Sequence, residues 1–345
     1  MRVFLPAILS AGSLLTIAAA PAPAPPPPAQ AINNATLPAA HAPAAAKSAA
    51  LIRAEVLLAR AHFSPGVIDG QEGGNLTNAI TAFQHAKGLP VSGKLDEAVW
   101  QALTGADATP VVVDYVITDQ DVAGPFIPAV PKEYPDMAKL DRLAFTSPLE
   151  ALAEKFRMDE ALLKRLNPGA DFSKPGTHLL AAETGPETLP GAVTAIEVDK
   201  GARQVRAYGA DGMLLAAFPA TVGSTERPAP TGVFSVTGVA PNPTYTYDPK
   251  RLTYGDKSVG KVTVKPGPNN PVGAVWIDLS IPTYGIHGAP EPRLVGKVAS
   301  HGCVRLTNWD VRTLASAVKK GVKVSFVGSE GERPAAGKTS SASAG

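Results

Sequence analysis

The chain has very little cysteine: Cys303 is the only one in 345 residues. A single cysteine cannot form an intramolecular disulfide, and it excludes every metal or redox motif that needs several thiolates. None of the six histidines lies four residues from another, as the ligands of a His-x-x-x-His zinc site do. We therefore expect neither a metal nor another cofactor, and a zinc peptidase is a disfavoured alternative.

An excess of charge of one sign is also missing. Lys and Arg number 32 and Asp and Glu number 30, which gives a formal net charge of +2. The sequence has no run of basic residues of the kind that follows a phosphate backbone. Such a balance produces no strong field toward nucleic acid or anionic lipid. Nucleic acid is therefore not an expected partner.

Long apolar runs are absent except in residues 1–20. There, Arg2 is followed by an apolar stretch that ends in three alanines, which is the pattern of a secretory signal peptide. Pro21 follows the most obvious cleavage site, so a retained anchor is the alternative. No other stretch is apolar for long enough to span a bilayer. We expect an exported protein of the periplasm or cell envelope that touches the membrane only through this segment.

The next two segments differ in composition. Residues 21–47 are rich in Pro and Ala, which predicts an extended linker because such a segment buries no core. Residues 48–104 have helical periodicity, a turn at Ser92-Gly93 and Asp96 as the N-cap of a third helix. With Phe83-Gln84, this ordered pattern resembles the peptidoglycan-binding domain 1 family. The resemblance implies a small three-helix wall-binding domain, and a plain helical spacer is the alternative.

Residues 105–190 combine a proline-marked connector with two short predicted helices. Ser147 is the expected N-cap of the first helix, and Asp159 begins the second. A strand-like segment, 177–180, follows. This order resembles a LysM-type glycan-binding module and implies an α+β middle region. Leu143-Ala144-Phe145 is the candidate for its first strand.

Residues 191–328 change to short alternating apolar segments separated by turns, which predicts a mainly β sandwich or barrel. One helix is expected soon after Cys303, capped by Thr307 or Asn308. Residues 329–345 are rich in Gly, Ser and Ala and predict a disordered tail. The expected architecture is therefore multidomain.

Cys303 is the centre of the predicted chemistry. In an exported protein an unpaired thiol is open to oxidation, which favours a functional cysteine over an inert buried one. A thiol is a weak nucleophile until it loses its proton, so it needs a base, and His287 and His301 are the candidates. Gly288 and Gly302 remove side-chain bulk beside both groups, which would let a peptide approach the backbone.

Two histidine motifs carry a family resemblance. Gly285-Ile286-His287-Gly288 and Ser300-His301-Gly302-Cys303-Val304-Arg305 resemble the catalytic motif of the YkuD-type L,D-transpeptidases. The preceding segments 267–273 and Trp276-Ile277-Asp278-Leu279 are also similar to that family. The resemblance implies a cell-wall enzyme that acts on peptidoglycan stem peptides and glycan strands.

The resemblance also implies a mechanism. Cys303 attacks a stem tetrapeptide and expels its terminal D-alanine, and an amine of a second stem then takes the thioester, which gives a 3→3 cross-link. His287 is the implied general base. His301, with Ser300 and Gly302, supports the thiol or the oxyanion, which backbone N–H groups near Cys303 are suited to stabilise.

Further roles follow from the same resemblance. Arg305 is implied to hold a substrate carboxylate, with a surface salt bridge as the alternative. Tyr284 lines the site or donates to the oxyanion, with packing as the alternative. Apart from the resemblance, the residues before Trp276 predict a long loop over the site, whose aromatic residues, among them Tyr245 and Tyr247, either contact substrate or only hold the loop in place. Carbapenems acylate the cysteine of this family and are the expected covalent inhibitors.

Three other functions stay open at this point. Water as the acceptor would make the protein an L,D-carboxypeptidase. A lysine of an envelope protein as the acceptor would make it an enzyme that links protein to the wall. A chain whose catalytic fold is inactive would be a wall-binding structural protein, a reading that the complete set of motif residues disfavours.

Overall fold

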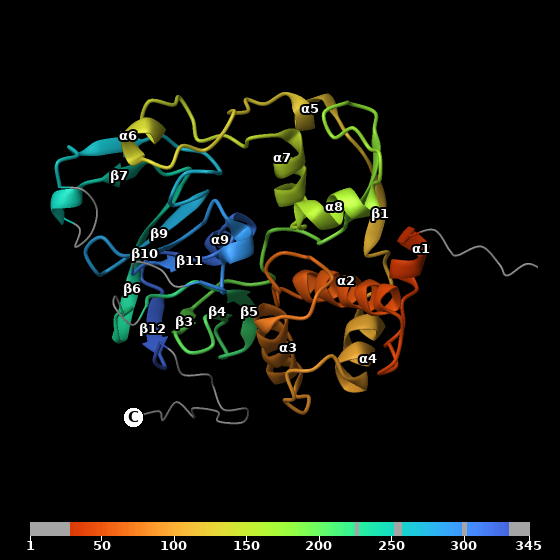
Figure 1. Ribbon diagram of the computed structural model, residues 1–345. Helices are drawn as coiled ribbons and strands as arrows, with labels where there is room; N and C mark the ends of the chain where they lie inside the picture. Colours follow the sequence, from red (N-terminus) through yellow and green to blue (C-terminus); the bar gives the residue numbers. More distant parts are fainter. Residues whose placement is uncertain (1–27, 225–227, 252–256, 299–301, 331–345) are drawn as a thin grey trace, which may run out of the picture.

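A computed structural model describes residues 28–224, 228–251, 257–298 and 302–330. It places a helical part and a small α+β part next to each other, and both beside a β domain (Figure 1). The predicted signal peptide and nearly all of the predicted tail lie outside the described residues, as do Ser300 and His301. Within the described ranges, no helix is long and apolar enough to cross a membrane.

The helical part confirms the expected three-helix unit. Its helices are α2 (Ala44–Arg60), α3 (Gly74–Lys87) and α4 (Glu97–Ala106). Asp96 caps α4 as expected, because its carboxylate accepts the Val99 backbone N–H at 3.0 Å. The buried Gln84 amide oxygen accepts the backbone N–H groups of Ser92 and Gly93, so this glutamine fixes the turn that follows α3.

The prediction of an extended linker over residues 21–47 is wrong for the part that the structure describes, because two helical segments lie there. Residues 28–33 form α1 (Pro28–Asn33), and α2 already begins at Ala44. Ile32 is 3% exposed in the core that α1 shares with α2, and the Asn33 side chain bonds the backbone of Val112 in both directions. Proline suits the first helical position, and one buried isoleucine anchors the segment, so composition alone misjudged it.

The middle region is α+β, as expected. Strand β1 (Val112–Val116) pairs antiparallel with β2 (His178–Ala182), and α7 (Pro148–Lys155) and α8 (Glu160–Leu166) lie between them in sequence. The first strand is therefore not 143–145. That segment instead binds the β domain, where the Leu143 N–H donates to the Pro266 carbonyl at 3.0 Å.

The long connection from β1 to α7 runs outward over the β domain (Figure 1). It contains two short helices, α5 (Asp119–Val122) and α6 (Tyr134–Met137). At its end the Ser147 hydroxyl accepts the Glu150 N–H at 3.2 Å and caps α7, as the sequence predicts. The Glu150 carboxylate, however, binds Thr146 rather than closing the capping box on Ser147.

The β domain contains one eight-stranded sheet with the strand order β11-β10-β9-β6-β12-β3-β4-β5. Thr221, just after β5, exchanges two backbone hydrogen bonds of 2.9 Å with Arg305 of β11, so the two edges of the sheet meet. The mainly β prediction is confirmed. The strands are β3 (Ala195–Asp199), β4 (Gln204–Tyr208), β5 (Leu214–Pro219), β6 (Gly232–Pro241), β9 (Val275–Leu279), β10 (Gly285–His287), β11 (Val304–Arg305) and β12 (Lys323–Val327).

Two more strands, two 3-10 turns and one helix complete the β domain. Strands β7 (Tyr245–Tyr247) and β8 (Val262–Val264) form a separate antiparallel hairpin, and the 3-10 turns are Pro249–Arg251 and Pro292–Leu294. Helix α9 (Asn308–Ala317) follows β11, and Thr307 caps it by accepting the Asp310 N–H. Glu330, the last described residue, accepts the Ala229 N–H, so the ordered chain extends past residue 329.

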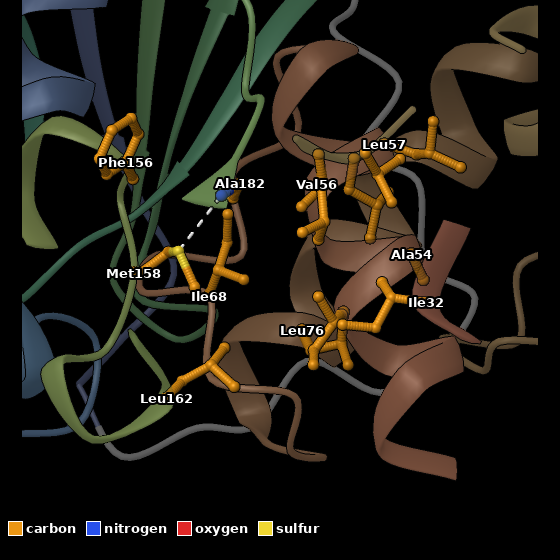
Figure 2. Packing of buried hydrophobic residues seen from close by; sticks show 14 of the residues in the cluster. Ile32, Ala54, Val56, Leu57, Ile68, Leu76, Phe156, Met158, Leu162 and Ala182 are labelled. Carbon is orange, nitrogen blue, oxygen red and sulfur yellow. Dashed lines mark hydrogen bonds between the residues drawn. The ribbon is translucent and has the colours of Figure 1, made fainter. Parts of the chain in front are cut away.

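The helical and middle parts share one hydrophobic core, and the β domain has another. Figure 2 shows Ile68 of the helical part beside Met158, whose sulfur accepts the Ala182 N–H at 3.3 Å. The helical part also covers an edge of the sheet, because Phe63 forms a parallel bridge to Ala217 of β5. Covering that edge removes an exposed row of unpaired backbone groups.

Asp310 gives this packing a pH dependence that can be measured. Its carboxyl is 1% exposed and accepts the Ser64 hydroxyl at 3.0 Å, and burial raises its pKa to about 7. The folded state therefore holds this proton more tightly than the unfolded chain, and the stability it contributes is lost as the pH rises through about 7.

We expect the free energy of unfolding of the wild type to fall, relative to Asp310→Asn, by on the order of 3 kcal/mol between pH 5 and pH 8. Urea unfolding of both proteins at the two pH values measures this difference, and other titrating groups cancel in the comparison. An unchanged difference between the two proteins would mean that Asp310 is ionised in the fold.

Candidate active site

The two motif segments lie side by side. Strands β10 and β11 are parallel neighbours, with His287 paired to Arg305, and the Leu306 N–H donates to the His287 carbonyl at 2.8 Å. Paired residues of parallel strands share a face, so His287 and Arg305 point to the same side of the sheet. Cys303 immediately precedes β11. The structure thus brings the expected nucleophile next to the strand of the expected base.

The Cys303 thiol is partly exposed and held by the backbone. The Gly285 N–H donates a hydrogen bond to the sulfur, and the Thr283 carbonyl lies 3.9 Å from it. Burial raises the pKa of the thiol above its usual value, although the Gly285 hydrogen bond and the Arg305 charge oppose the shift. At neutral pH the resting group is therefore a thiol that needs a base.

His287 is 3% exposed and has a fixed tautomer. Its Nδ1 lies 2.6 Å from the Gly288 carbonyl oxygen, which only accepts, so Nδ1 carries the proton and Nε2 keeps its lone pair. Burial, then the charge of Arg305, lowers the pKa of the ring to about 3, and the Gly288 bond opposes this. The imidazole is therefore neutral at working pH and able to accept a proton.

Trp276 of β9 is the cross-strand partner of His287, and the two rings are stacked with centroids 5.3 Å apart and planes at 18°. The indole is itself fixed, because its N–H donates to Asp278 at 3.1 Å and Asp278 accepts the Thr237 hydroxyl at 2.6 Å. This stack sets the plane of the imidazole. In sequence the Trp276 segment is only similar to the family, and the role of this side chain becomes visible in the strand register that stacks it on His287.

Replacing Trp276 tests whether the stack matters for proton transfer. An aromatic face stabilises an imidazolium by about 0.5–2 kcal/mol, so Trp276→Leu should slow acylation of Cys303 by roughly 3-fold to 30-fold. Trp276→Phe keeps a ring and should lose less. Stopped-flow acylation by a carbapenem measures both rates. Equal acylation rates for the two variants would show that the aromatic ring at position 276 does not contribute to proton transfer.

The two site glycines have different surroundings. A Cβ on Gly288 would lie 2.3 Å from the Asn308 side-chain oxygen and 3.0 Å from the Ala274 nitrogen. The expected open approach beside Gly288 is therefore wrong, because Asn308 occupies that space and binds the Ala274 N–H. At Gly302, which has a φ of +139°, the nearest atom to a Cβ within the described ranges is a Tyr284 ring carbon at 3.9 Å, and an open approach there stays a prediction because residues 299–301 lie outside those ranges.

Tyr284 holds the backbone next to the nucleophile. Its hydroxyl donates to the Gly302 carbonyl at 2.5 Å, and burial raises the pKa of the phenol, so the donor proton is retained. In a planar trans peptide the next N–H points opposite to that carbonyl. The Cys303 N–H is therefore directed away from Tyr284, and the phenol proton is already in use.

Arg305 lies close enough to lower the pKa of both Cys303 and His287. Its Nε is buried and has no hydrogen-bond partner among the residues that the structure describes. A guanidinium with an unused N–H beside a nucleophile is suited to a carboxylate. Because Ser300 and His301 lie outside the described residues, their predicted roles stay predictions.

The predicted long loop before Trp276 contains the β7–β8 hairpin, and α6 packs against it (Figure 1). The Tyr134 ring of α6 stacks on Tyr247 with centroids 4.3 Å apart. The Asn269 N–H donates to the Leu143 carbonyl at 2.9 Å, which ties the next loop to the same connector. The hairpin aromatics are therefore pinned by the middle region, and coverage of the site by this hairpin stays a prediction.

In the described ranges, no three His, Cys, Asp or Glu side chains are grouped so as to hold a metal ion. Comparison with known proteins adds two family models. The L,D-transpeptidase catalytic domain, YkuD, matches residues 193–325, and a peptidoglycan-binding domain matches residues 47–103.

A Bacillus licheniformis protein named as the L,D-transpeptidase YkuD is 32% identical over 181 residues, which are 52% of this chain and 92% of that protein. The chain belongs to the YkuD family of L,D-transpeptidases. The Escherichia coli K12 protein named as L,D-transpeptidase ErfK/SrfK is 30% identical over 188 residues, 53% of this chain and 60% of its own.

Among solved structures, the catalytic domain of an Enterococcus faecium L,D-transpeptidase is 23% identical, covers 39% of this chain and 96% of its own, and has a TM-score of 0.31. The two family models confirm the resemblance of the catalytic domain to YkuD and of the helical domain to the peptidoglycan-binding family. The LysM-like resemblance of the middle region has no such match and stays a prediction.

Proposed function

We propose that this family member forms 3→3 cross-links in peptidoglycan through a thioester on Cys303, with release of D-alanine. The observation that carries the proposal is the pairing of β10 with β11. It sets a neutral, tautomer-fixed His287 on the strand next to a thiol whose pKa is raised. A protonated thiol beside a neutral imidazole is the arrangement that a base-assisted acyl transfer needs.

The proposed reaction has two steps. His287 takes the thiol proton, the sulfur forms a bond to the donor carbonyl carbon, and the bond to D-alanine breaks as its nitrogen receives that proton. An amine of a second stem then attacks the thioester carbon and gives a proton to His287, the C–S bond breaks, and the leaving Cys303 sulfur takes that proton back to become the thiol. No metal or other cofactor enters either step, because every proton and bond is accounted for by these groups.

The oxyanion of both steps needs donors near the sulfur. The Cys303 N–H is the nearest backbone candidate, and the Tyr284 bond to the Gly302 carbonyl fixes the peptide that carries it. Tyr284 thus acts in this proposal by positioning the donor and does not itself donate to the oxyanion. Ser300 and His301 are proposed to support the same region.

Arg305 is proposed to bind the terminal carboxylate of the donor. A charge-assisted hydrogen bond is worth about 1.5–3 kcal/mol, so Arg305→Gln should raise KM for a tetrapeptide donor by roughly 10-fold to 100-fold. A tetrapeptide amide lacks that carboxylate and should show little change in KM. Steady-state kinetics with both donors measures this, and an equal rise for both would place Arg305 in a general structural role.

The decisive experiment incubates the purified protein with a disaccharide-tetrapeptide and reads the products by mass spectrometry. A dimer that has lost one D-alanine supports transpeptidation, whereas the tripeptide alone would identify an L,D-carboxypeptidase. If neither forms but a carbapenem still acylates Cys303, the acceptor is a different amine, such as a lysine of an envelope protein. If neither a product nor a carbapenem adduct forms, the proposal of an enzyme fails and a wall-binding structural protein is the remaining function.

The remaining parts fit delivery of this site to the wall. The peptidoglycan-binding match of residues 47–103 supports contact with the wall polymer. The order β1, α7, α8, β2 supports a LysM-like glycan-binding role for the middle region, which we propose without a family match. Export to the periplasm or cell envelope through residues 1–20 is proposed on the sequence pattern alone.

A further inference from the structure

The proposed base has a support on the side of Gly288. The side chain of Asn308, which is 1% exposed, lies against this glycine. Its Oδ1 is 2.3 Å from the position that a Cβ on Gly288 would take, and equally close to that of a Cβ on Gly273. The Gly288 carbonyl accepts the Nδ1 proton of His287. Asn308 therefore packs on the glycine whose carbonyl sets the tautomer of the base.

Hydrogen bonds fix the orientation of the Asn308 amide. Its Oδ1 accepts the Ala274 N–H at 2.9 Å, and its Nδ2 donates to a Glu154 carboxylate oxygen at 2.9 Å and to the Pro268 carbonyl at 3.1 Å. A flipped amide would set its NH2 group against the Ala274 N–H and its oxygen against two acceptors. Only one orientation is therefore satisfied, and it is the one that places Oδ1 beside Gly288.

Glu154 comes from a different part of the chain. It lies on α7 of the middle region, 154 positions before Asn308, and its side chain is 11% exposed. The second oxygen of its carboxylate lies 3.2 Å from an Arg312 nitrogen of α9. Both oxygens of Glu154 therefore bind donors on α9, and the middle region reaches into the support of the proposed base.

Loss of the Glu154 carboxylate would disturb this support. One N–H of the buried Asn308 amide would lack its acceptor, which is costly for a buried polar group. Rotation of the amide toward another acceptor would relieve that cost and would withdraw Oδ1 from Ala274 and Gly288. The Gly288 carbonyl would then no longer be held against Nδ1, and the Nε2–H tautomer of His287 becomes accessible. That tautomer presents an N–H to the thiol in place of a lone pair, so it cannot take the proton.

We propose that Glu154 is a positioning residue for His287: through Asn308 it holds the Gly288 carbonyl that keeps the imidazole proton on Nδ1. This role rests on the proposed function, in which His287 is the base. It gives the middle region a part in the chemistry that its proposed glycan binding does not include.

Removal of the Glu154 acceptor tests this role in the full chain. Glu154→Ala should slow acylation of Cys303 by a carbapenem by roughly 5-fold to 30-fold, because the hydrogen bond between a carboxylate and Asn308 is lost. Glu154→Leu removes the same acceptor but fills its volume, so it keeps the test valid if the alanine variant impairs folding. Stopped-flow mixing measures both acylation rates.

Two comparison variants separate positioning from packing between the parts of the chain. Glu154→Gln keeps an oxygen that can accept the Asn308 amide and loses the charge that faces Arg312, so its acylation rate should stay within about threefold of the wild type. Glu187→Ala removes the other carboxylate that binds Arg312, at 2.7 and 3.1 Å, and leaves the Asn308 bond to Glu154 in place. It is the matched control and should acylate at the wild-type rate.

The tautomer of His287 is a readout that a merely structural role would not move. Ring ¹⁵N NMR of histidine-labelled protein distinguishes a protonated imidazole nitrogen from an unprotonated one, and His287→Gln assigns the signals. The wild type should show the proton on Nδ1, and Glu154→Ala and Glu154→Leu should both show the Nε2–H form. The measurement needs no turnover, so it tests the positioning even if His287 is not the base.

The two readouts together decide the proposal. A slower acylation rate with an unchanged tautomer would overturn it, as would an equal loss of rate in Glu187→Ala or Glu154→Gln. An Nδ1 proton and wild-type acylation in both Glu154→Ala and Glu154→Leu would show that Glu154 only packs the parts together, which also overturns it. A tautomer shift without a slower rate would support the positioning and contradict the proposed function, because acylation would then not depend on His287 as the base.

Discussion

Cys303→Ala is expected to abolish turnover and carbapenem acylation while the folded chain keeps its binding to peptidoglycan. No other thiol exists in the chain, so none is available to take over the covalent step. The methyl group of alanine fills less space than the thiol, and the residue is only partly buried, so the fold should be retained. Intact-protein mass spectrometry after carbapenem treatment and a sedimentation assay with isolated cell walls measure the two properties.

Cys303→Ser is the matched control for this substitution. The hydroxyl preserves shape and hydrogen bonding, but its far higher pKa makes it a poor nucleophile even beside His287. We expect activity at least about 100-fold below the wild type, with wall binding unchanged. If the alanine variant keeps turnover, Cys303 is not the nucleophile. If both variants lose wall binding, the substitution disturbs the fold.

Much of this site was predictable because its motifs are local in sequence. His287-Gly288 and the segment around Cys303 carry the family pattern, and the alternating apolar segments predict the mainly β domain that holds them. The caps Ser147 and Asp96 were predicted, and Thr307 was one of two candidates with Asn308, because capping depends on a side chain and the next three backbone N–H groups.

Features that depend on distant contacts were missed. The strand at 112–116 is defined by its partner at 178–182, and an apolar trio at 143–145 competed for the assignment. Gly288 was interpreted as open space, whereas Asn308, which follows it by 20 positions in the numbering, fills that space. Ile32 was hidden in a Pro- and Ala-rich segment because one buried residue scarcely changes composition.

Trp276 illustrates the same limit at the site itself. Its motif was noticed, yet its stacking on His287 follows from the antiparallel register of β9 and β10, which sequence does not state. The raised pKa of Cys303 and the lowered pKa of His287 likewise depend on burial in the folded chain. These two pKa shifts determine that His287 must act as a neutral base toward a protonated Cys303 thiol.

His287→Gln is expected to slow acylation of Cys303 by roughly 100-fold to 10,000-fold at pH 7, because loss of a general base has that size. In the wild type the imidazole pKa of about 3 keeps the base neutral, so base assistance should persist down to pH 5. In the variant only preformed thiolate reacts. Since the pKa of the thiol is raised, that rate should climb about tenfold per pH unit through pH 9.

The gap between the two proteins should therefore narrow as the pH rises, which loss of structure alone would not produce. Stopped-flow acylation by a carbapenem from pH 5 to pH 10 measures both profiles. His178→Gln, on the exposed side of β2, is the control and should follow the wild type. If the acylation rate of His287→Gln changes with pH in parallel with that of the wild type, another group is the base. His301 would then be the first residue to test, by the same substitution.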